Sequence, residues 1–432
     1  MGIHKGDGDE MNGNTRTVVA IKAQISKFSG IISKGISKPK RRLIKEMLYG
    51  IQAAKDIKLS NIARTLNETI SLIKTEDRLS RNLDDEDFTE AINNEICRLA
   101  SARVNDDMVI AIDPGDIRKK YASKMEYLCK VHDGSEHEIG EGYWLCKAVA
   151  ADIEHKKVIP LYLEAYSQES KDFASENAQL FKVIDTVTEH VGEKGIYAVD
   201  RGGDRRKLYE KLLQKGKEKR FVIRLTKKRD LIHKGKQKNC HLMASSLSCT
   251  HKAVLIKYES GKEQEKTVFY SAVSVKLPDR DYPLYVIVVK GFGKEPMMLL
   301  TSCPVDLTVK ESIWRIVEIY LTRWKCDESF RYIKQCYNLE DIRVRHYIAI
   351  RNVVVLILAV SYFAAVYLGD NLKLKMLVER VYIVSKRFFG VPTFFNYAVA
   401  DGLHNLLFSN KTGICPTKAP DKTDFQLCFD FW

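Results

Sequence analysis

The chain has 432 residues, 45% of them hydrophobic, and its 70 Lys and Arg outnumber 56 Asp and Glu, which gives a net charge of +14 at pH 7. This composition excludes a wholly disordered chain, and its 24 Gly and 10 Pro are too few for a fibrous or low-complexity protein. The positive excess predicts an anionic partner, either nucleic acid or an acidic membrane surface.

The cysteines and the N-terminal residues predict a cytoplasmic protein. Ten cysteines are scattered without a C-x-x-C pair in a chain too long to need disulfide crosslinks. Residues 1–17 form a polar, Gly-rich leader without the apolar segment of a secretory signal.

The first hundred residues are expected to form a helical, basic domain. Residues 1–82 hold 16 Lys and Arg against 8 Asp and Glu. Residues 58–67 predict a short helix capped by Ser60, and residues 68–83 a second helix that follows it without a clear break. Two short basic helices suit a helix-turn-helix that reads the DNA major groove, and equally a helical bundle with a solvated basic face. Both interpretations stay open at this stage.

Residues 104–240 are expected to form the first part of a mixed α/β core. Short apolar runs predict strands at residues 108–112, 127–131, 143–149, 157–166 and 195–199, and residues 170–190 predict a helix. Strands first, followed by alternating helix and strand, are typical of such a domain. Residues 201–240 then carry 16 Lys and Arg against 4 Asp and Glu, so the positive charge is concentrated here.

The remaining chain is divided into three predicted parts. Residues 241–303 alternate with period two and predict a β-rich insertion, with strands at 253–258, 266–275, 284–289 and 297–301. Residues 304–370 predict the second part of the core, with one unusually long helix at 309–335 and another at 348–368. The apolar stretch 353–368 is short for a membrane span and favours a buried core helix. Residues 371–432 are expected to be helical and then irregular.

Two acids follow directly after predicted buried strands. Asp113 follows the strand at 108–112, and Asp200 follows the strand at 195–199 and opens the most basic part of the chain. Open α/β sheets bind ligands at the carboxyl ends of their strands. Either acid alone suits a turn, but two of them in one domain favour a functional site.

A third acid, Asp327, belongs to the predicted helix at 309–335. At 100° per residue, Asp327 lies about 40° from Arg323 and Arg331 and about 20° from Tyr320 and Lys334 around the helix. An exposed helix would use such a face for weak ion pairs. Because core-like residues flank this one, we expect a place where a metal ion and phosphate meet.

The spacing of Tyr320, Arg323, residue 327 and Lys334 resembles the Y-x2-R-x3-E-x6-K signature of insertion-sequence transposases of the DDE class. Asp113 and Asp200 resemble the first and second acids of that family, and the similarity runs from about residue 43 to residue 366. It implies an α/β fold with a ribonuclease-H-like mixed-sheet core, interrupted by the β-rich insertion and preceded by the helical domain. It also implies that Asp113, Asp200 and Asp327 are the catalytic, metal-binding acids.

The sequence departs from the family at the third acid. The family has Glu where this chain has Asp327, and Glu328 stands beside it. Register and helical face favour Asp327, since Glu328 points about 100° away, although its longer side chain keeps it as the alternative third acid. If neither carboxylate completes the site, the protein is a catalytically inactive or domesticated DNA-binding protein derived from a transposase.

The expected chemistry is two-metal phosphoryl transfer that cleaves DNA at the ends of an insertion element and joins the 3′-OH ends to target DNA. Carboxylates suit Mg²⁺, for which Mn²⁺ is expected to substitute. Tyr320, Arg323, Arg331, Lys334 and Arg201 are expected to bind DNA. The partners implied are double-stranded DNA, which carries the terminal repeats or the target, and a second copy of the chain, with no membrane involved. The protein would act in the cytoplasm on chromosomal DNA.

A zinc site is a lesser alternative. Cys240, His241, Cys249, His251 and His233 offer zinc-type ligands, but their irregular spacing matches no common zinc finger.

Overall fold

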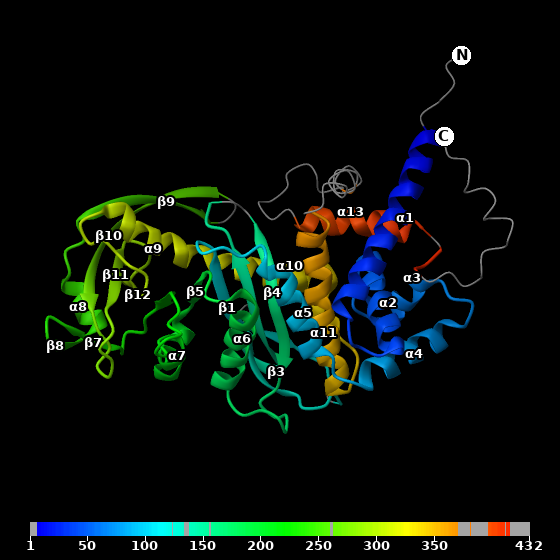
Figure 1. Ribbon diagram of the computed structural model, residues 1–432, viewed down its shortest axis with the longest axis horizontal. Helices are drawn as coiled ribbons and strands as arrows, with labels where there is room; N and C mark the ends of the chain where they lie inside the picture. The colour runs from blue at the N-terminus through cyan, green and yellow to red at the C-terminus, as the bar shows by residue number, and fades with distance from the viewer. Residues whose placement is uncertain are drawn as a thin grey trace, which may run out of the picture.

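The computed structural model describes residues 7–122, 124–133, 138–154, 157–259, 262–369, 381, 396–410 and 412–414. A large mixed sheet runs through the molecule, and the N-terminal helices pack together at one end of it (Figure 1). These helices are α1 (Asp7–Ile32), α2 (Lys38–Ala54), α3 (Leu59–Leu66), α4 (Leu72–Asp84) and α5 (Thr89–Ser101).

The main sheet has ten strands in the order β2-β3-β1-β5-β6-β12-β11-β10-β9, with β4 paired to β3. Its strands are β1 (Val109–Arg118), β2 (Cys129–Asp133), β3 (Glu138–Ala151), β4 (Val158–Tyr166), β5 (Ile196–Val199), β6 (Phe221–Arg224), β9 (His251–Glu259), β10 (Lys262–Val275), β11 (Leu284–Lys290) and β12 (Met297–Thr301). A separate hairpin joins β7 (Asp230–His233) to β8 (Lys236–Asn239).

The centre of the sheet combines an antiparallel and a parallel part. β1, β3 and β4 pair antiparallel. The chain then crosses through α6 (Glu176–Val191) to β5, which lies parallel to β1, and through the 3-10 turn η1 (Arg201–Gly203) and α7 (Arg206–Leu212) to β6, parallel to β5. β1 and β3 approach each other closely at Gly142, where a Cβ would lie 2.0 Å from the Ile117 carbonyl oxygen of β1.

The strands predicted within residues 241–303 form nearly at their expected places, but they do not build a sheet of their own. β12 pairs with β6, and β11, β10 and β9 follow outward, so the insertion lengthens the central sheet. Because β6 would otherwise be an open edge, this pairing satisfies its backbone groups. α8 (Cys240–Ser246) connects the hairpin to β9.

The long helix predicted at residues 309–335 is in fact two helices, α9 (Lys310–Thr322) and α10 (Trp324–Tyr337). They meet at Arg323, whose N–H donates to the Tyr320 carbonyl and whose carbonyl accepts from the Cys326 N–H. Both bonds span three residues, so the chain tightens at the junction as in a 3-10 turn. α9 packs on one face of the sheet, where Ile316, Ile319 and Tyr320 join the strand residues Val109 and Ala198 in one apolar cluster.

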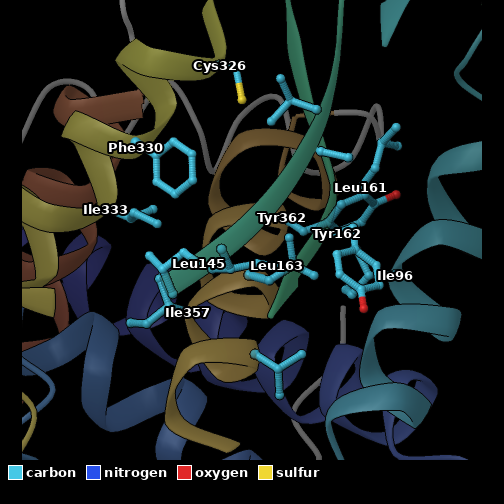
Figure 2. Packing of buried hydrophobic residues seen from close by; sticks show 14 of the residues in the cluster. Ile96, Leu145, Leu161, Tyr162, Leu163, Cys326, Phe330, Ile333, Ile357 and Tyr362 are labelled. Atoms are coloured by element: carbon cyan, nitrogen blue, oxygen red, sulfur yellow. The ribbon is translucent and has the colours of Figure 1, made fainter. Parts of the chain in front are cut away.

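The predicted core helix forms as α11 (Tyr347–Tyr362), continued by the π-turn η3 (Phe363–Tyr367) and preceded by the 3-10 turn η2 (Leu339–Asp341). The stretch Tyr347–Tyr367 is long and apolar enough to cross a membrane, with a mean hydropathy of 2.1, but 83% of its most apolar window is buried inside the protein. This agrees with the buried core helix that the sequence favoured. Around it, side chains from α5, α10 and the strands β3 and β4 form a continuous core (Figure 2).

Details of the helical end differ from expectation. The leader predicted at residues 1–17 is helical from Asp7 onward. α3 begins at Leu59 without a side-chain cap from Ser60. A clear break separates α3 from α4, because Asn67 adopts a left-handed conformation with φ 47°. Of the C-terminal region predicted at 371–432, α13 (Asn396–Phe408) is described; most of the rest, with Cys415 and Cys428, lies outside the described residues.

Candidate active site

The first two predicted acids lie level with each other on neighbouring parallel strands. β1 pairs with β5 from Val109 opposite Ile196 to Ala111 opposite Ala198. The same register, continued by two residues, brings Asp113 opposite Asp200, and the period of two turns both toward the face that α9 covers. One difference from the sequence prediction is that β1 does not end before Asp113. It continues to Arg118 through its pairing with β3.

Asp200 also shapes the loop that follows it. Its carboxylate accepts a hydrogen bond of 2.7 Å from the Gly202 N–H at the start of η1. A Cβ on Gly202 would lie 2.9 Å from the same carboxylate oxygen. Glycine at this position therefore leaves the Asp200 side chain room at the edge of the sheet.

α10 brings the third acid to this edge. The helix crosses β1 closely at Gly115, where a Cβ would lie 3.0 Å from the Phe330 ring. One turn earlier in the helix stands Asp327, whose side chain is 46% exposed. It lies i,i+4 from Arg323, as the helical face predicts, and their closest approach is 3.3 Å.

The three acids are electrostatically linked. The pKa of Asp113 is raised, first because burial disfavours its charged form, then because of the hydrogen bond to Asp327 and the negative charges of Asp327 and Asp200. Arg323 opposes this rise. Burial and the charges of the two other acids therefore outweigh the opposing cation at Asp113.

That cation is Arg323, a buried residue at the junction of α9 and α10. Its guanidinium lies 3.6 Å from Asp113 and 3.3 Å from Asp327, and 5.7 Å from the centre of the Tyr320 ring. Although burial alone would lower the pKa of Arg323, the charges of Asp327 and Asp113 raise it above its ordinary value. Its Nε has no hydrogen-bond partner among the described residues.

The other predicted site residues occupy different positions. Tyr320 is buried beneath Arg323, so its ring is not a free surface. Lys334 lies 3.0 Å from Glu340 and 3.6 Å from Asp116 of β1. Arg331, Arg201 and Glu328 are exposed.

Two residues of this region were not singled out by the sequence. Asp116 continues β1 beyond Asp113 and pairs with Lys334. Lys147 is a buried lysine in the middle of β3, directly opposite Asp113. Burial lowers its pKa to about 8, although Cys326 and Asp113 oppose the shift. A lysine inside an otherwise apolar predicted strand was the sequence signal that could have identified it.

Asp204, the second acid of the Asp200 loop, has a structural role. Its fully buried side chain accepts from Arg229 Nε at 2.7 Å, from the Tyr209 hydroxyl at 2.9 Å and from the Thr226 N–H at 2.8 Å. Burial, followed by the neighbouring Asp204 charge, raises the pKa of Tyr209 well above its ordinary value. This network ties the loop after β5 to the chain after β6.

Many of the cations in the basic stretch 201–240 are paired with acidic side chains and so are not available to a ligand. Of its 16 cations, seven form ion pairs: Arg205, Arg206, Lys211, Lys219, Arg220, Lys227 and Arg229. Most of their partners come from other segments, such as Glu176 and Asp185. The exposed lysines of the β7–β8 hairpin, Lys234, Lys236 and Lys238, form no ion pair with the residues that the structure describes.

The described residues hold no ready-made metal centre. Within them, no group of three or more His, Cys, Asp or Glu side chains is arranged to hold a metal ion. At the acids, Arg323 lies where the carboxylates approach one another. The residues of the alternative zinc site have other contacts. Cys240 donates to the Thr226 carbonyl, His233 Nδ1 is hydrogen-bonded to the Ser274 carbonyl and His251 packs against Tyr270.

Comparison with known proteins adds little. No protein-family model matches the chain, and no curated protein matches its sequence. Among solved structures, a piggyBac transposase in a synaptic complex with hairpin DNA is similar with a TM-score of 0.43 and 12% identity, over 94% of this chain and 85% of that chain.

Proposed function

We propose that this chain is a transposase-like enzyme that cleaves and joins DNA strands. The observation that carries the proposal is the convergence of Asp113, Asp200 and Asp327, from two parallel strands and one helix, on one edge of the sheet. The strand order supports a ribonuclease-H-like core for residues 104–240 and 304–370, because an antiparallel trio, β4-β3-β1, is extended by the parallel strands β5 and β6.

The donor set fits a hard divalent cation. Carboxylate oxygens are the ligands that Mg²⁺ takes, with water and phosphate completing its shell, and Mn²⁺ accepts the same donors. Asp113, Asp200 and Asp327 would hold the metal, with Glu328 as the alternative third ligand. Bound there, it would supply charge neutralisation at the phosphodiester and a more acidic water. The crowded negative charge around Asp113 is the reason to expect a cation at this edge.

The protein's own cations suit the substrate. Arg323 could exchange its two hydrogen bonds to Asp327, of 3.3 and 3.4 Å, for a phosphate, because a guanidinium binds phosphate and carboxylate oxygens with the same donors. The exposed Arg331 and Arg201 would contact the flanking backbone, with Lys334 close by. In the proposed reaction, water attacks phosphorus and releases a 3′-OH. That hydroxyl then attacks a phosphodiester of target DNA, so one bond forms as another breaks in each step.

The same proposal assigns the partners. Duplex DNA carrying the element's ends or the target would lie along the acid edge, and two copies of the chain would hold two ends. The site of action would be chromosomal DNA in the cytoplasm. The helical end, residues 1–100, would grip DNA beside the cut.

A second candidate is a DNA-binding protein without chemistry. The observation in its favour is that Arg323 pairs with Asp113 and Asp327, two of the three carboxylates that would have to bind the metal. Among the described residues, no group of three or more such side chains is arranged to hold a metal ion. In that case the acids and Arg323 would simply neutralise one another.

One experiment distinguishes the enzyme from the DNA-binding protein. Purified protein is incubated with supercoiled plasmid and with duplexes taken from the flanks of its own reading frame. Cleavage in Mg²⁺ or Mn²⁺ that EDTA abolishes, and that Asp113→Asn and Asp327→Asn remove, supports the enzyme. Glu328→Gln is the matched control. Full activity of Asp327→Asn beside an inactive Glu328→Gln would reassign the third acid, and metal-independent binding without cleavage would leave the DNA-binding protein.

A further inference from the structure

Lys147 is a buried charge that the proposed chemistry does not use. It lies in the middle of β3 with a side chain only 2% exposed. Its Nζ donates a 2.6 Å hydrogen bond to the Ser329 hydroxyl and lies 4.8 Å from the centre of the Phe330 ring. Lysine is almost never fully buried unless it is paired, because desolvating its ammonium group is costly. A lysine held here therefore needs an explanation.

The position of Lys147 relates it to the acid edge. On the paired strands Lys147 lies opposite Asp113, and Leu145 lies opposite Gly115. Residues directly opposite each other on antiparallel strands point to the same face, so the Lys147 side chain lies on the same side of the sheet as Asp113. α10 lies on that side, and Phe330 packs against Gly115.

The middle of α10 contacts these strands through apolar side chains, while its ends make polar contacts, Lys334 with Asp116 and Lys325 with the Asp152 carbonyl. Cys326, Phe330 and Ile333 form one stripe of the helix, and Figure 2 shows Phe330 and Ile333 facing the strand that carries Leu145. Apolar contact is not directional, so such a stripe tolerates small rotations and slides of the helix. The hydrogen bond from Lys147 to Ser329 is directional and buried, and it fixes one point of α10 two residues from Asp327.

We propose that Lys147 is a positioning residue that fixes α10 on the sheet and so sets Asp327 relative to Asp113. The inference rests on the proposed function, since it assigns Asp327 to the site. Lys147 acts through Ser329 and is too deeply buried to touch DNA. A displacement of a reacting group by about 1 Å can cost about 100-fold in rate, so a single anchoring bond is enough to matter.

The test compares variants that remove one end of the bond. Lys147→Met and Ser329→Ala each delete it, Ser329→Thr keeps the accepting hydroxyl, and the double variant Lys147→Met/Ser329→Ala removes both polar ends. The matched control is Lys219→Met, which deletes another buried lysine, paired with Glu193 at 4.0 Å, away from the acid edge. Three properties are measured for the folded protein: single-turnover nicking of supercoiled plasmid at saturating Mn²⁺, hydrogen exchange of the α10 amides and the melting temperature.

Lys147→Met and Ser329→Ala are expected to nick about 10- to 100-fold more slowly and to exchange the α10 amides faster, while Ser329→Thr stays within about twofold of wild type. The double variant is expected to be no slower than either single variant, because both delete the same bond. Lys219→Met should lower the melting temperature without slowing nicking. A purely structural role for Lys147 would instead change melting temperature alone.

The inference is overturned if Lys147→Met and Ser329→Ala keep the wild-type rate, or if their effects add. Should Lys147→Met fail to fold, the comparison of Ser329→Ala with Ser329→Thr decides the matter. If wild-type protein does not nick DNA at all, the proposed function fails on its own. Hydrogen exchange still tests Lys147 in that case: faster exchange of α10 in Ser329→Ala alone supports the anchor, and unchanged exchange contradicts it.

Discussion

Asp200 and Asp204 belong to the same short loop, yet the structure assigns them opposite roles, and substituting each tests the assignment. Asp200 lies at the acid edge and accepts one hydrogen bond, from the Gly202 N–H. Asp204 is buried and joins Arg229, Tyr209 and Thr226. We expect Asp200→Asn to abolish metal-dependent DNA cleavage in a stable protein, and Asp204→Ala to destabilise the fold.

The magnitudes follow from these contacts. Removing Asp204 leaves the Arg229 guanidinium without its buried partner and the Thr226 N–H without an acceptor, and breaking such a pair costs about 3 to 5 kcal/mol. In a chain of this size that corresponds to a fall in melting temperature of about 3 to 6 °C. Asp200→Asn keeps the shape of the side chain and an oxygen acceptor for Gly202, so its cost should stay below about 1 kcal/mol.

Differential scanning fluorimetry measures the first effect, and nicking of supercoiled plasmid in Mg²⁺ or Mn²⁺ measures the second. Circular dichroism of both variants at 20 °C checks that the protein compared is folded. The reasoning is refuted if Asp200→Asn melts several degrees below wild type while Asp204→Ala does not. It is refuted equally if Asp204→Ala loses cleavage at an unchanged melting temperature while Asp200→Asn cleaves normally.

Three further predictions concern other parts of the molecule. Gly142→Ala should destabilise the sheet by about 2 kcal/mol or more, measured by urea unfolding, because the new Cβ meets a backbone oxygen 2.0 Å away; a neutral substitution would contradict this. Asp84 raises the pKa of His346, so their ion pair stabilises the fold at low pH and loses its effect as pH rises through the folded pKa. His346→Asn should therefore lower stability by at most about 0.5 kcal/mol near pH 5.5 and leave it unchanged at pH 9, since the pair is exposed. Lys236→Glu on the β7–β8 hairpin should weaken binding to duplex DNA and reduce its salt dependence, whereas Lys211→Ala, which loses a pair with Asp185, should not; equal effects in a filter-binding titration would argue against the hairpin as a contact.

Local patterns predicted much of the secondary structure. β12 has the predicted bounds, and β4, β5 and β11 begin or end within one residue of them, because short β-branched runs bounded by turn residues have few alternatives. The boundaries that failed depended on long-range contacts. The helix expected at 309–335 breaks at Arg323, where the buried guanidinium meets two carboxylates, one of them 210 positions earlier in the chain. No local pattern carries that information.

The candidate site shows the same division. Spacing alone put Arg323 and Asp327 on one helical face, and they do pair. It also put Lys334 on that face, but Lys334 pairs with Asp116 on β1 and with Glu340 in η2. Lys147 escaped notice because its importance comes from standing opposite Asp113 across two strands, and strand register is set by the whole sheet.

The sequence by itself determined the kinds of elements, their order, and an excess of positive charge that calls for an anionic partner. Only the tertiary structure decided where that charge is available, because acids outside residues 201–240 pair with six of the 16 cations in this stretch, and Asp204 pairs with a seventh, Arg229. It also decided which acids meet. Composition fixes the number of charges, but Coulomb interactions fall with distance, so only the folded arrangement determines which charges face a substrate and which face each other.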